Sequence, residues 1–115
     1  MAKTLLLTEF GMGSSLRRQD YTEAAKRAIT HALWRNSINL AELFGKQKTD
    51  MIIDVMVGVA QPESVDIAQV KSVFPYGQIS VEVVQGGLDV ERIDAVPNVM
   101  ANVAISVSLD LDGAA

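Results

Sequence analysis

One segment near the end of the chain alternates between two kinds of side chain from residue 99 to residue 111. The positions of one set are apolar, those of the other are small or polar, and the two sets interleave: Val99, Ala101, Val103, Ile105, Val107, Leu109 and Leu111 against Asn102, Ala104, Ser106, Ser108 and Asp110. Because successive side chains of a strand point to opposite faces of its sheet, this pattern predicts a long strand with one buried face.

Three further strands and two main helices are predicted before it. The strands lie at 3–10, 51–59 and 78–84. Asp20 is an expected N-cap, Glu23 completes a capping-box pattern, and the helix that they begin ends near Arg35. Its apolar stripe is Tyr21, Ala24, Ala25, Ala28, Ile29, Ala32 and Leu33. A further short helix is expected at 38–44, and a second main helix at 65–74 is cut off by Pro75. Residues 88–98 are expected to be irregular or a short turn of helix, closed by Pro97.

The predicted order is β-α-β-α-β-β, which indicates a single α/β (α+β) domain over 1–115 with a mixed four-stranded sheet. Two helices cover only one side of such a sheet. The other side carries Thr8, Ile52, Asp54, Met56, Ser80, Glu82, Val84, Ala104 and Ser106. That mixture is too apolar for a face open to water and too polar for an ordinary core. It predicts an interface with other subunits, and the alternative is a plain solvated face.

Composition excludes several classes of function. The net charge of −4 argues against a general nucleic-acid binder, which needs a broad basic surface. The absence of cysteine excludes disulfides, thiolate nucleophiles and Cys-ligated metals, and it fits a reducing compartment. The start of the chain is too short for a signal-peptide core, and no apolar run of about 18 residues occurs. A cytoplasmic protein without membrane or nucleic-acid partners is expected, with no required metal or nucleotide cofactor.

The segment between the first strand and the first helix is the clearest candidate site. Gly11 and Gly13 permit a tight loop and close approach of a ligand, Ser14 and Ser15 follow, and Arg17 and Arg18 suit carboxylates and phosphates. The segment is neither a full dinucleotide fingerprint nor a nucleotide-triphosphatase phosphate loop. The alternative is a plain turn, with both arginines solvated or paired with Glu9 or Asp20.

Other polar residues have weaker claims. His31, the only histidine, shares a helix flank with Trp34, and both fit a surface or subunit contact better than catalysis. Asp54 and Glu82 interrupt two strands on one face. Two carboxylates facing each other would suit acid–base chemistry or metal binding. The interpretation that we favour is that they pair with arginines across an interface. Gln85 and Gly86 end a strand, where their backbone meets a ligand or forms a turn.

The stretch GMGSSLRRQDYTEAAKRAI, together with the later VVQGGL, resembles a small conserved-hypothetical family named after a Listeria open reading frame. The resemblance runs through most of the chain. The family is marked by an N-terminal G-x-G-x-D-x-H-G signature. Gly11 and Gly13 match it, whereas Ser15, Arg17 and Arg18 stand where Asp, His and Gly would be. The resemblance implies a kind of protein and no reaction, and it puts any activity tied to the replaced pair in doubt.

Two fold-level likenesses point to an assembly. A Phe-Pro turn after the second helix and a Gly-Gly-Leu after the third strand resemble the trimeric Bacillus-type chorismate mutases, and so imply a chorismate-mutase/YjgF-like oligomer. The segment from Thr8 also resembles part of the ring-opening amidohydrolases of the cyanuric acid hydrolase type. Those enzymes use Lys and Ser, and here Leu7 and Gln85 stand at the corresponding positions. Both likenesses imply three related units about an axis, with sites between them.

Two hypotheses about function follow. In the first, the protein binds a small anion, carboxylate or cyclic amide at a subunit junction, and the site consists of Glu9, Gly11, Gly13, Ser14, Ser15, Arg17 and Arg18 with Gln85 and Gly86 of a neighbour. In the second, it is a non-catalytic assembly or regulatory subunit that has lost the family's Asp and His. The retained glycines and added arginines favour the first, and we adopt it for binding without assigning catalysis.

Overall fold

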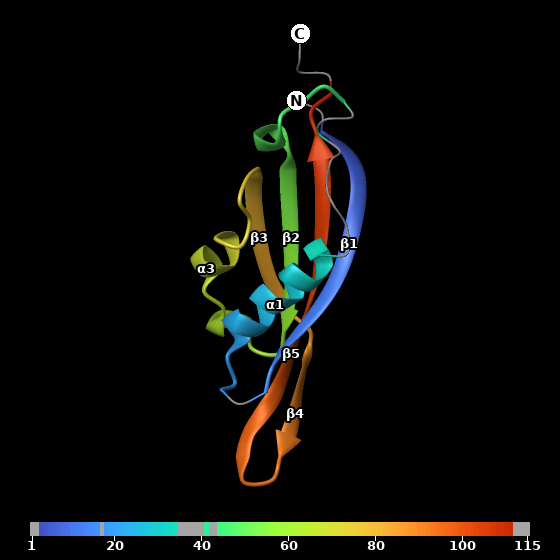
Figure 1. Cartoon of the computed structure of the whole chain (residues 1–115). Coiled ribbons are helices and arrows are strands. Elements are labelled where there is room, and N and C mark those ends of the chain that lie inside the picture. The colour runs from blue at the N-terminus through green and yellow to red at the C-terminus, as the bar shows by residue number, and fades with distance from the viewer. Residues whose placement is uncertain (1–2, 17, 35–40, 42–43, 112–115) are drawn as a thin grey trace.

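The computed structural model describes residues 3–16, 18–34, 41 and 44–111. Figure 1 shows one sheet with its helices. The strands are β1 (Thr4–Ser15), β2 (Ile52–Val59), β3 (Gln78–Gln85), β4 (Leu88–Arg92) and β5 (Ala95–Leu109). The helices are α1 (Tyr21–Trp34) and α3 (Ile67–Lys71), with single 3₁₀ turns at Lys48–Asp50 and Pro62–Ser64.

The long strand β5 organises the sheet. The order is β1-β5-β2-β3, in which β5 runs antiparallel to β1 and β2 while β2 and β3 are parallel. The short strand β4 also pairs with β5, so the mixed sheet has five strands and not the four predicted. The predicted α/β class is confirmed. The helix-linked strands β1 and β2 do not touch, because β5 lies between them.

Both described helices lie on one face of the sheet. The apolar positions of β5, Val99 through Leu109, are buried there with Ile53, Val55, Val57 and Val59 of β2. The helix α1 covers them with the small, fully buried side chains of Ala24, Ala25, Ala28 and Ala32. The alternation in β5 therefore reports its burial as predicted.

The first helix begins where the sequence predicts, although its cap is different. The carboxylate of Asp20 accepts a hydrogen bond from the backbone N–H of Glu23 at 3.0 Å, which is half of a capping box. The other half is absent, because the Glu23 carboxylate pairs with Arg27 Nε at 3.3 Å and the backbone N–H of Asp20 donates to Ser15 Oγ. Ser15 therefore takes the place that Glu23 would have in the box.

The predicted glycine loop at 11–15 is wrong, because these residues continue β1. They pair with β5 in unbroken register from Gly11 opposite Val103 to Ser15 opposite Val99. The glycines are required by the closeness of α1. A Cβ on Gly11 would lie 2.3 Å from Ala28 O, and one on Gly13 would lie 2.3 Å from Ala28 N. Glycine in β1 thus meets alanine in α1 so that two backbones approach each other.

Residues 88–98 were expected to be irregular, and they form β4 and the start of β5 instead. The backbone reaches this hairpin through Gly86 and Gly87, which pass the end of β2. The N–H of Gly86 donates to Val59 O, and Gly87 has a positive φ of 59°. Pro97 is accommodated within β5 because the pairing with β4 is irregular between Val90 and Arg92.

Other boundaries moved less. The second helix was predicted at 65–74, yet only Ile67–Lys71 is α-helical, capped by Asp66, whose carboxylate accepts from Gln69 N–H. The predicted end of the first helix at Arg35 and most of the predicted helix at 38–44 lie outside the described residues. No helix in the described ranges is long and apolar enough to cross a membrane.

We call the side of the sheet opposite α1 and α3 the open face. Directly paired residues share a face, and the register places Asp54 opposite Ser80 and Ser106, and Met56 opposite Glu82 and Ala104. Thr8 lies beside Ser106, with 3.3 Å between their hydroxyl oxygens. The open face therefore has the mixed composition that the sequence predicted.

Candidate functional site

The open face is hollowed by a groove of about 520 Å³. Its lining comes from four strands and from one side chain of α1: Phe10, Gly11, Met12, His31, Met56, Gly58, Val84, Gln85, Gly86, Met100, Asn102, Val103 and Ala104. Three residues predicted as ligand contacts, Gly11, Gln85 and Gly86, thus meet in one groove of one chain.

The groove is deepened at Gly58, which has no side chain to fill it. Gly58 lies between Asn102 of β5 and Val84 of β3. It is two residues after Met56 in β2 and therefore lies on the same, open face. A Cβ on Gly58 would lie 2.5 Å from Asn102 Oδ1 and 3.3 Å from Gly86 Cα. The missing side chain lets the Asn102 amide lie flat across β2. Asn102 Oδ1 accepts there from the backbone N–H of Gly87 at 3.2 Å.

The backbone donors expected at the Gly-Gly turn are already engaged. Gly86 N–H binds Val59 O, and Gly87 N–H binds Asn102 Oδ1. These hydrogen bonds indicate that the two glycines let the backbone pass the end of β2. A ligand in this groove would therefore contact side chains and carbonyl groups rather than the N–H groups of the turn.

His31 contributes a polar group at the rim. Its Nδ1 accepts a hydrogen bond from the backbone N–H of Met12 at 3.1 Å, across the outer edge of β1. In a neutral imidazole whose Nδ1 accepts, the proton is on Nε2, so His31 presents an N–H donor. The same edge is covered again where Arg27 Nη1 donates to Ser14 O at 2.7 Å. Two side chains of α1 thus occupy backbone groups of an edge strand.

The groove is apolar with a few neutral polar groups. The side chains of Phe10, Met12, Met56 and Met100 line it, and its polar side chains are His31, Gln85 and Asn102. None of its described lining residues is Asp, Glu, Lys or Arg. Such a lining suits a flat, largely neutral ring that carries hydrogen-bonding groups, because apolar walls with few polar groups give orientation and burial together.

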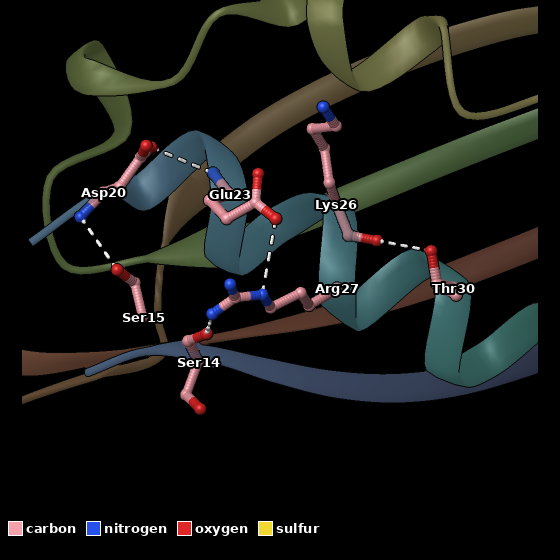
Figure 2. A network of polar contacts seen from close by, with 7 residues as sticks. All are labelled: Ser14, Ser15, Asp20, Glu23, Lys26, Arg27 and Thr30. Carbon is pink, nitrogen blue, oxygen red and sulfur yellow. Dashed lines mark hydrogen bonds and ion pairs between the residues drawn. The ribbon is translucent and has the colours of Figure 1, made fainter. Parts of the chain in front are cut away.

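A second, separate pocket of about 520 Å³ lies at the start of α1 and contains the arginine predicted to bind an anion. Ser15, Leu16, Arg18, Asp20, Glu23 and Arg27 line it. Figure 2 shows that Asp20 caps the helix and that Arg27 is held between Glu23 and Ser14 O. Two carboxylates therefore stand beside the two guanidinium groups, and Asp20 occupies the helix N-terminus that an anion would need.

The remaining predicted contacts lie apart from the groove. Gly13 faces α1, and Glu9 lies opposite Ile105 on the helix-covered side. Ser14 offers its carbonyl to Arg27, and Ser15 is buried with its hydroxyl on Asp20 N–H. Arg17 and the side chain of Trp34 lie outside the described residues. The predicted set is therefore divided between the groove, the second pocket and the packing under α1.

The two carboxylates of the open face, Asp54 and Glu82, line one pocket of about 300 Å³ apart from the groove. Asp54 pairs with Lys3 Nζ at 2.7 Å, which is a partner within the chain rather than an arginine of a neighbour. Glu82 lies opposite Met56 and so stands one pair further along the face. In the described part of the chain, no three His, Cys, Asp or Glu side chains gather as metal ligands would.

Sequence reasoning missed Phe10, Met12, Gly58, Met100 and Asn102 as groove residues. Met56 and Ala104 had been placed on the open face, and the same alternation that placed them there extends to Met100 and Asn102 of β5. The even-numbered residues of β5 point to the open face, so the sequence pattern could have identified Met100 and Asn102. Met12 was missed because the first strand was predicted to end at residue 10, whereas Phe10 lay within that strand and was not placed on the open face.

A buried polar pair on the helix side was also missed. Tyr21 is only 4% exposed, and its hydroxyl donates to Asp89 of β4 and accepts from Gln19 Nε2 at 3.3 Å. Burial and the hydrogen bond to Asp89 raise the pKa of Tyr21 above its ordinary value. The second oxygen of Asp89 is buried and has no hydrogen-bond partner among the described residues.

Comparison with known proteins places the chain among relatives of undetermined function. Residues 5–107 match the model of a family described as conserved hypothetical protein, Lin0512. A solved structure from Nostoc punctiforme, described as an FtsZ-like protein of unknown function, is 31% identical and superposes with a TM-score of 0.86. The match covers 96% of this chain and 98% of that one. None of the curated proteins compared with the chain matches it.

Proposed function

The chain belongs to the Lin0512 family of conserved hypothetical proteins, and from that premise we propose that it binds a small molecule in the groove of the open face. One observation supports the proposal most directly. Gly11 is far in sequence from Gln85 and Gly86, yet the three line one groove together with the polar side chains of His31 and Asn102.

The lining favours one of the three expected ligand classes. A cyclic amide offers a flat ring for Phe10 and Met56, and it carries a donor and an acceptor for the amide groups of Asn102 and Gln85. A carboxylate or phosphate would lack a cation among the described lining residues. Such an anion is better matched to Arg18 in the second pocket, where it competes with Asp20 and Glu23.

We place this site at a junction between copies of the chain. The groove lies on a face that the described helices leave open, so a ligand there stays partly in water unless a second subunit covers it. A homo-oligomer, most simply a trimer or a multiple of a trimer, supplies that cover. Its location in the cytoplasm, which we inferred from the absence of cysteine, stays a prediction.

A non-catalytic assembly or regulatory subunit is the second candidate. The observation in its favour is at position 15, where the family signature has Asp. Ser15 is buried, and its hydroxyl accepts a hydrogen bond from Asp20 N–H. The side chain at this position therefore holds the start of α1. Neither candidate assigns a reaction.

A thermal-shift screen with cyclic imides, carboxylates and phosphates tests binding. A ligand at a hundredfold excess over its dissociation constant stabilises the folded state by about 2.7 kcal/mol. Ala104→Leu fills the groove without removing a described hydrogen bond, so it should abolish the shift caused by a cyclic imide. Arg18→Ala is the matched control and should leave that shift unchanged.

The two variants also locate any other ligand. A shift lost in Arg18→Ala and kept in Ala104→Leu would move the site to the second pocket and overturn the groove proposal. No shift with any compound class, in a chain that sedimentation shows to be oligomeric, would favour the assembly subunit.

A further inference from the structure

A hairpin extends beyond the rest of the molecule. We call it the arm, and it consists of residues 88–98, which form β4 and the beginning of β5. Figure 1 shows it projecting below α1 and β1, and the described chain measures 60 × 24 × 18 Å along its principal axes. A two-stranded ribbon by itself is marginally stable in water, so a projecting one calls for a partner or an anchor.

Two side chains anchor the arm to the body, Arg92 beside its tip and Asp89 at its base. Arg92 Nη1 donates to Leu16 O at 2.6 Å and to Asn98 Oδ1 at 3.3 Å. On the helix side, Asp89 accepts the hydrogen bond from the buried hydroxyl of Tyr21. These contacts hold the ribbon in one direction, and a preorganised projection loses less conformational freedom when it binds.

The arm exposes apolar side chains that these anchors leave free. Leu88, Val90 and Val96 are exposed, and Ile93 at the tip is 93% exposed. Leu88 pairs with Met100 and Val90 with Asn98, so both side chains lie on the open face with Asn102. One apolar strip therefore runs from the groove, where Phe10 is 68% exposed, along the arm.

The open face and the arm together are large enough for a subunit contact. The body contributes four strands about 4.8 Å apart and about eight residues long at 3.3 Å each, which gives roughly 500 Å². The arm adds roughly 150 Å² as two strands of about five residues. The sum approaches the roughly 800 Å² per partner that a stable interface buries.

We propose that the arm of a second copy of this chain lies across the groove, with its Ile93 end against Phe10 and Met12, and closes the site. The inference rests on the proposed groove and specifies which part of the neighbouring copy covers it. Arm and groove are different parts of one continuous face, so each copy can offer an arm and receive one. The contact joins a projecting apolar edge to a hollowed apolar face.

Sedimentation of the full-length chain tests the contact with a matched pair of variants. Ile93→Asp puts a charge at the tip of the arm, where the side chain has little to do with folding, and should reduce the oligomer to the 12.4 kDa monomer. Ile67→Asp makes the same exchange at a 42% exposed position on α3, and should leave the oligomer intact. A parent that is already a monomer, or an Ile93→Asp variant that assembles like the parent, would overturn the proposal.

Cross-linking then tests which surfaces meet. The chain has no cysteine, so Ile93→Cys and Met12→Cys each introduce a single thiol. Mixed and oxidised, the two variants should form a linked dimer that contains one chain of each kind. Linked dimers in Ile93→Cys alone, with none added by Met12→Cys, would show the tips meeting each other and would contradict the proposal.

The results separate this contact from the function of the groove. If the chain is monomeric yet shows the cyclic-imide shift, the contact between arm and groove is refuted and the groove remains the proposed ligand site. If the cross-link between arm and groove forms but no compound causes a shift, the contact is supported and the groove is refuted as a ligand site.

Discussion

At the scale of single residues, the absence of two side chains matters as much as any that are present. Gly11 and Gly13 face α1, and a Cβ on either would lie 2.3 Å from a backbone atom of Ala28. In α1, Ala24, Ala28 and Ala32 recur every fourth residue, which puts them on one side of the helix above these glycines. The helix and strand therefore touch through small residues on both sides.

Gly13→Ala should destabilise the protein by about 1–3 kcal/mol, because an overpacked contact shifts or strains its neighbours. The atoms that the new methyl would meet belong to the backbone of α1, which cannot rotate away as a side chain can. Urea unfolding measures the change. Ser14→Ala, one residue along the same strand, should stay within about 0.5 kcal/mol of the parent.

Tyr21 and Asp89 form a second residue-scale test. Tyr21→Phe leaves the Asp89 carboxylate without its donor and should cost about 1–3 kcal/mol at neutral pH. Asp89→Asn supplies a matched comparison, because it removes the charge and keeps an amide oxygen as an acceptor for the phenol. It should therefore cost less than Tyr21→Phe, and equal losses would contradict the assigned role of this hydrogen bond.

The same pair predicts a dependence of stability on alkaline pH. Burial first, and Asp89 second, raise the pKa of Tyr21 above 10.0 in the folded chain. Below about pH 10 the phenol is protonated in both states, so its contribution is fully present. As pH rises further, the unfolded chain loses the proton first and the free energy of unfolding falls. Tyr21→Phe should show a shallower fall in the same series of urea titrations, and a parallel one would contradict this origin.

At the scale of elements, the crossing from β3 to β4 depends on Gly87. Its φ is 59°, and a Cβ there would lie 2.1 Å from Met100 O. Gly87→Ala should therefore weaken the pairing of β4 with β5. Hydrogen exchange should show faster exchange at residues 88–92 and 95–100 than in the parent.

Gly45→Ala separates backbone strain from collision in that experiment. Gly45 also has a positive φ, of 69°, but nothing lies within 4 Å of its Cβ position. It should lose about 1–2 kcal/mol from left-handed strain alone and leave exchange in the arm unchanged. A Gly87→Ala variant that behaves like Gly45→Ala would show that the contact with Met100 O is unimportant.

The elements that the sequence predicted well are those whose pattern reports local burial. The strand over 99–109 and the helix from Tyr21 were found because their apolar periods match their buried faces. The arm was missed because Pro97 and the Ile93-Asp94 turn are typical of irregular chain, although β4 pairs with the strand that directly follows it. Glycine carries no side chain to continue an alternation, so 11–15 was interpreted as a loop.

The candidate site was predicted in part for the same reason. Gly11, Gln85 and Gly86 do meet, since they end or interrupt strands on the same part of the sheet. Arg18 does not join them, because the extension of β1 to Ser15 carries the start of α1 away from the groove. Asn102 is the polar member of an alternating strand, and its place in the groove depends on the absence of a side chain at Gly58.

At the scale of the whole molecule, the chain is long and thin for its size. Its radius of gyration is 15.6 Å, against about 13 Å for a compact domain of this length. The excess comes with the projecting arm and the uncovered face of the sheet. Both features are expected of a subunit that buries part of its surface against copies of itself.

Assembly should therefore add to stability. If folding and association are coupled, the melting temperature of the parent should rise with protein concentration, because mass action favours the associated folded state. Calorimetry over a hundredfold range of concentration measures this. Ile93→Asp should melt at one temperature throughout the range, and a parent that does the same would contradict coupling.

The alanine-lined contact of α1 with β1 also divides the segment from Gly11 to Arg18 into two parts that carry different information. Its two glycines specify how near two stretches of main chain must come, which any descendant with this architecture has to preserve whatever it recognises. Of the later places, Ser15 holds the start of α1 through its hydroxyl and Arg18 lines the second pocket, so neither is set by that spacing. Two homologues that agree at the glycines thus share an inherited framework, and only agreement at the later places justifies transferring an activity from one to the other.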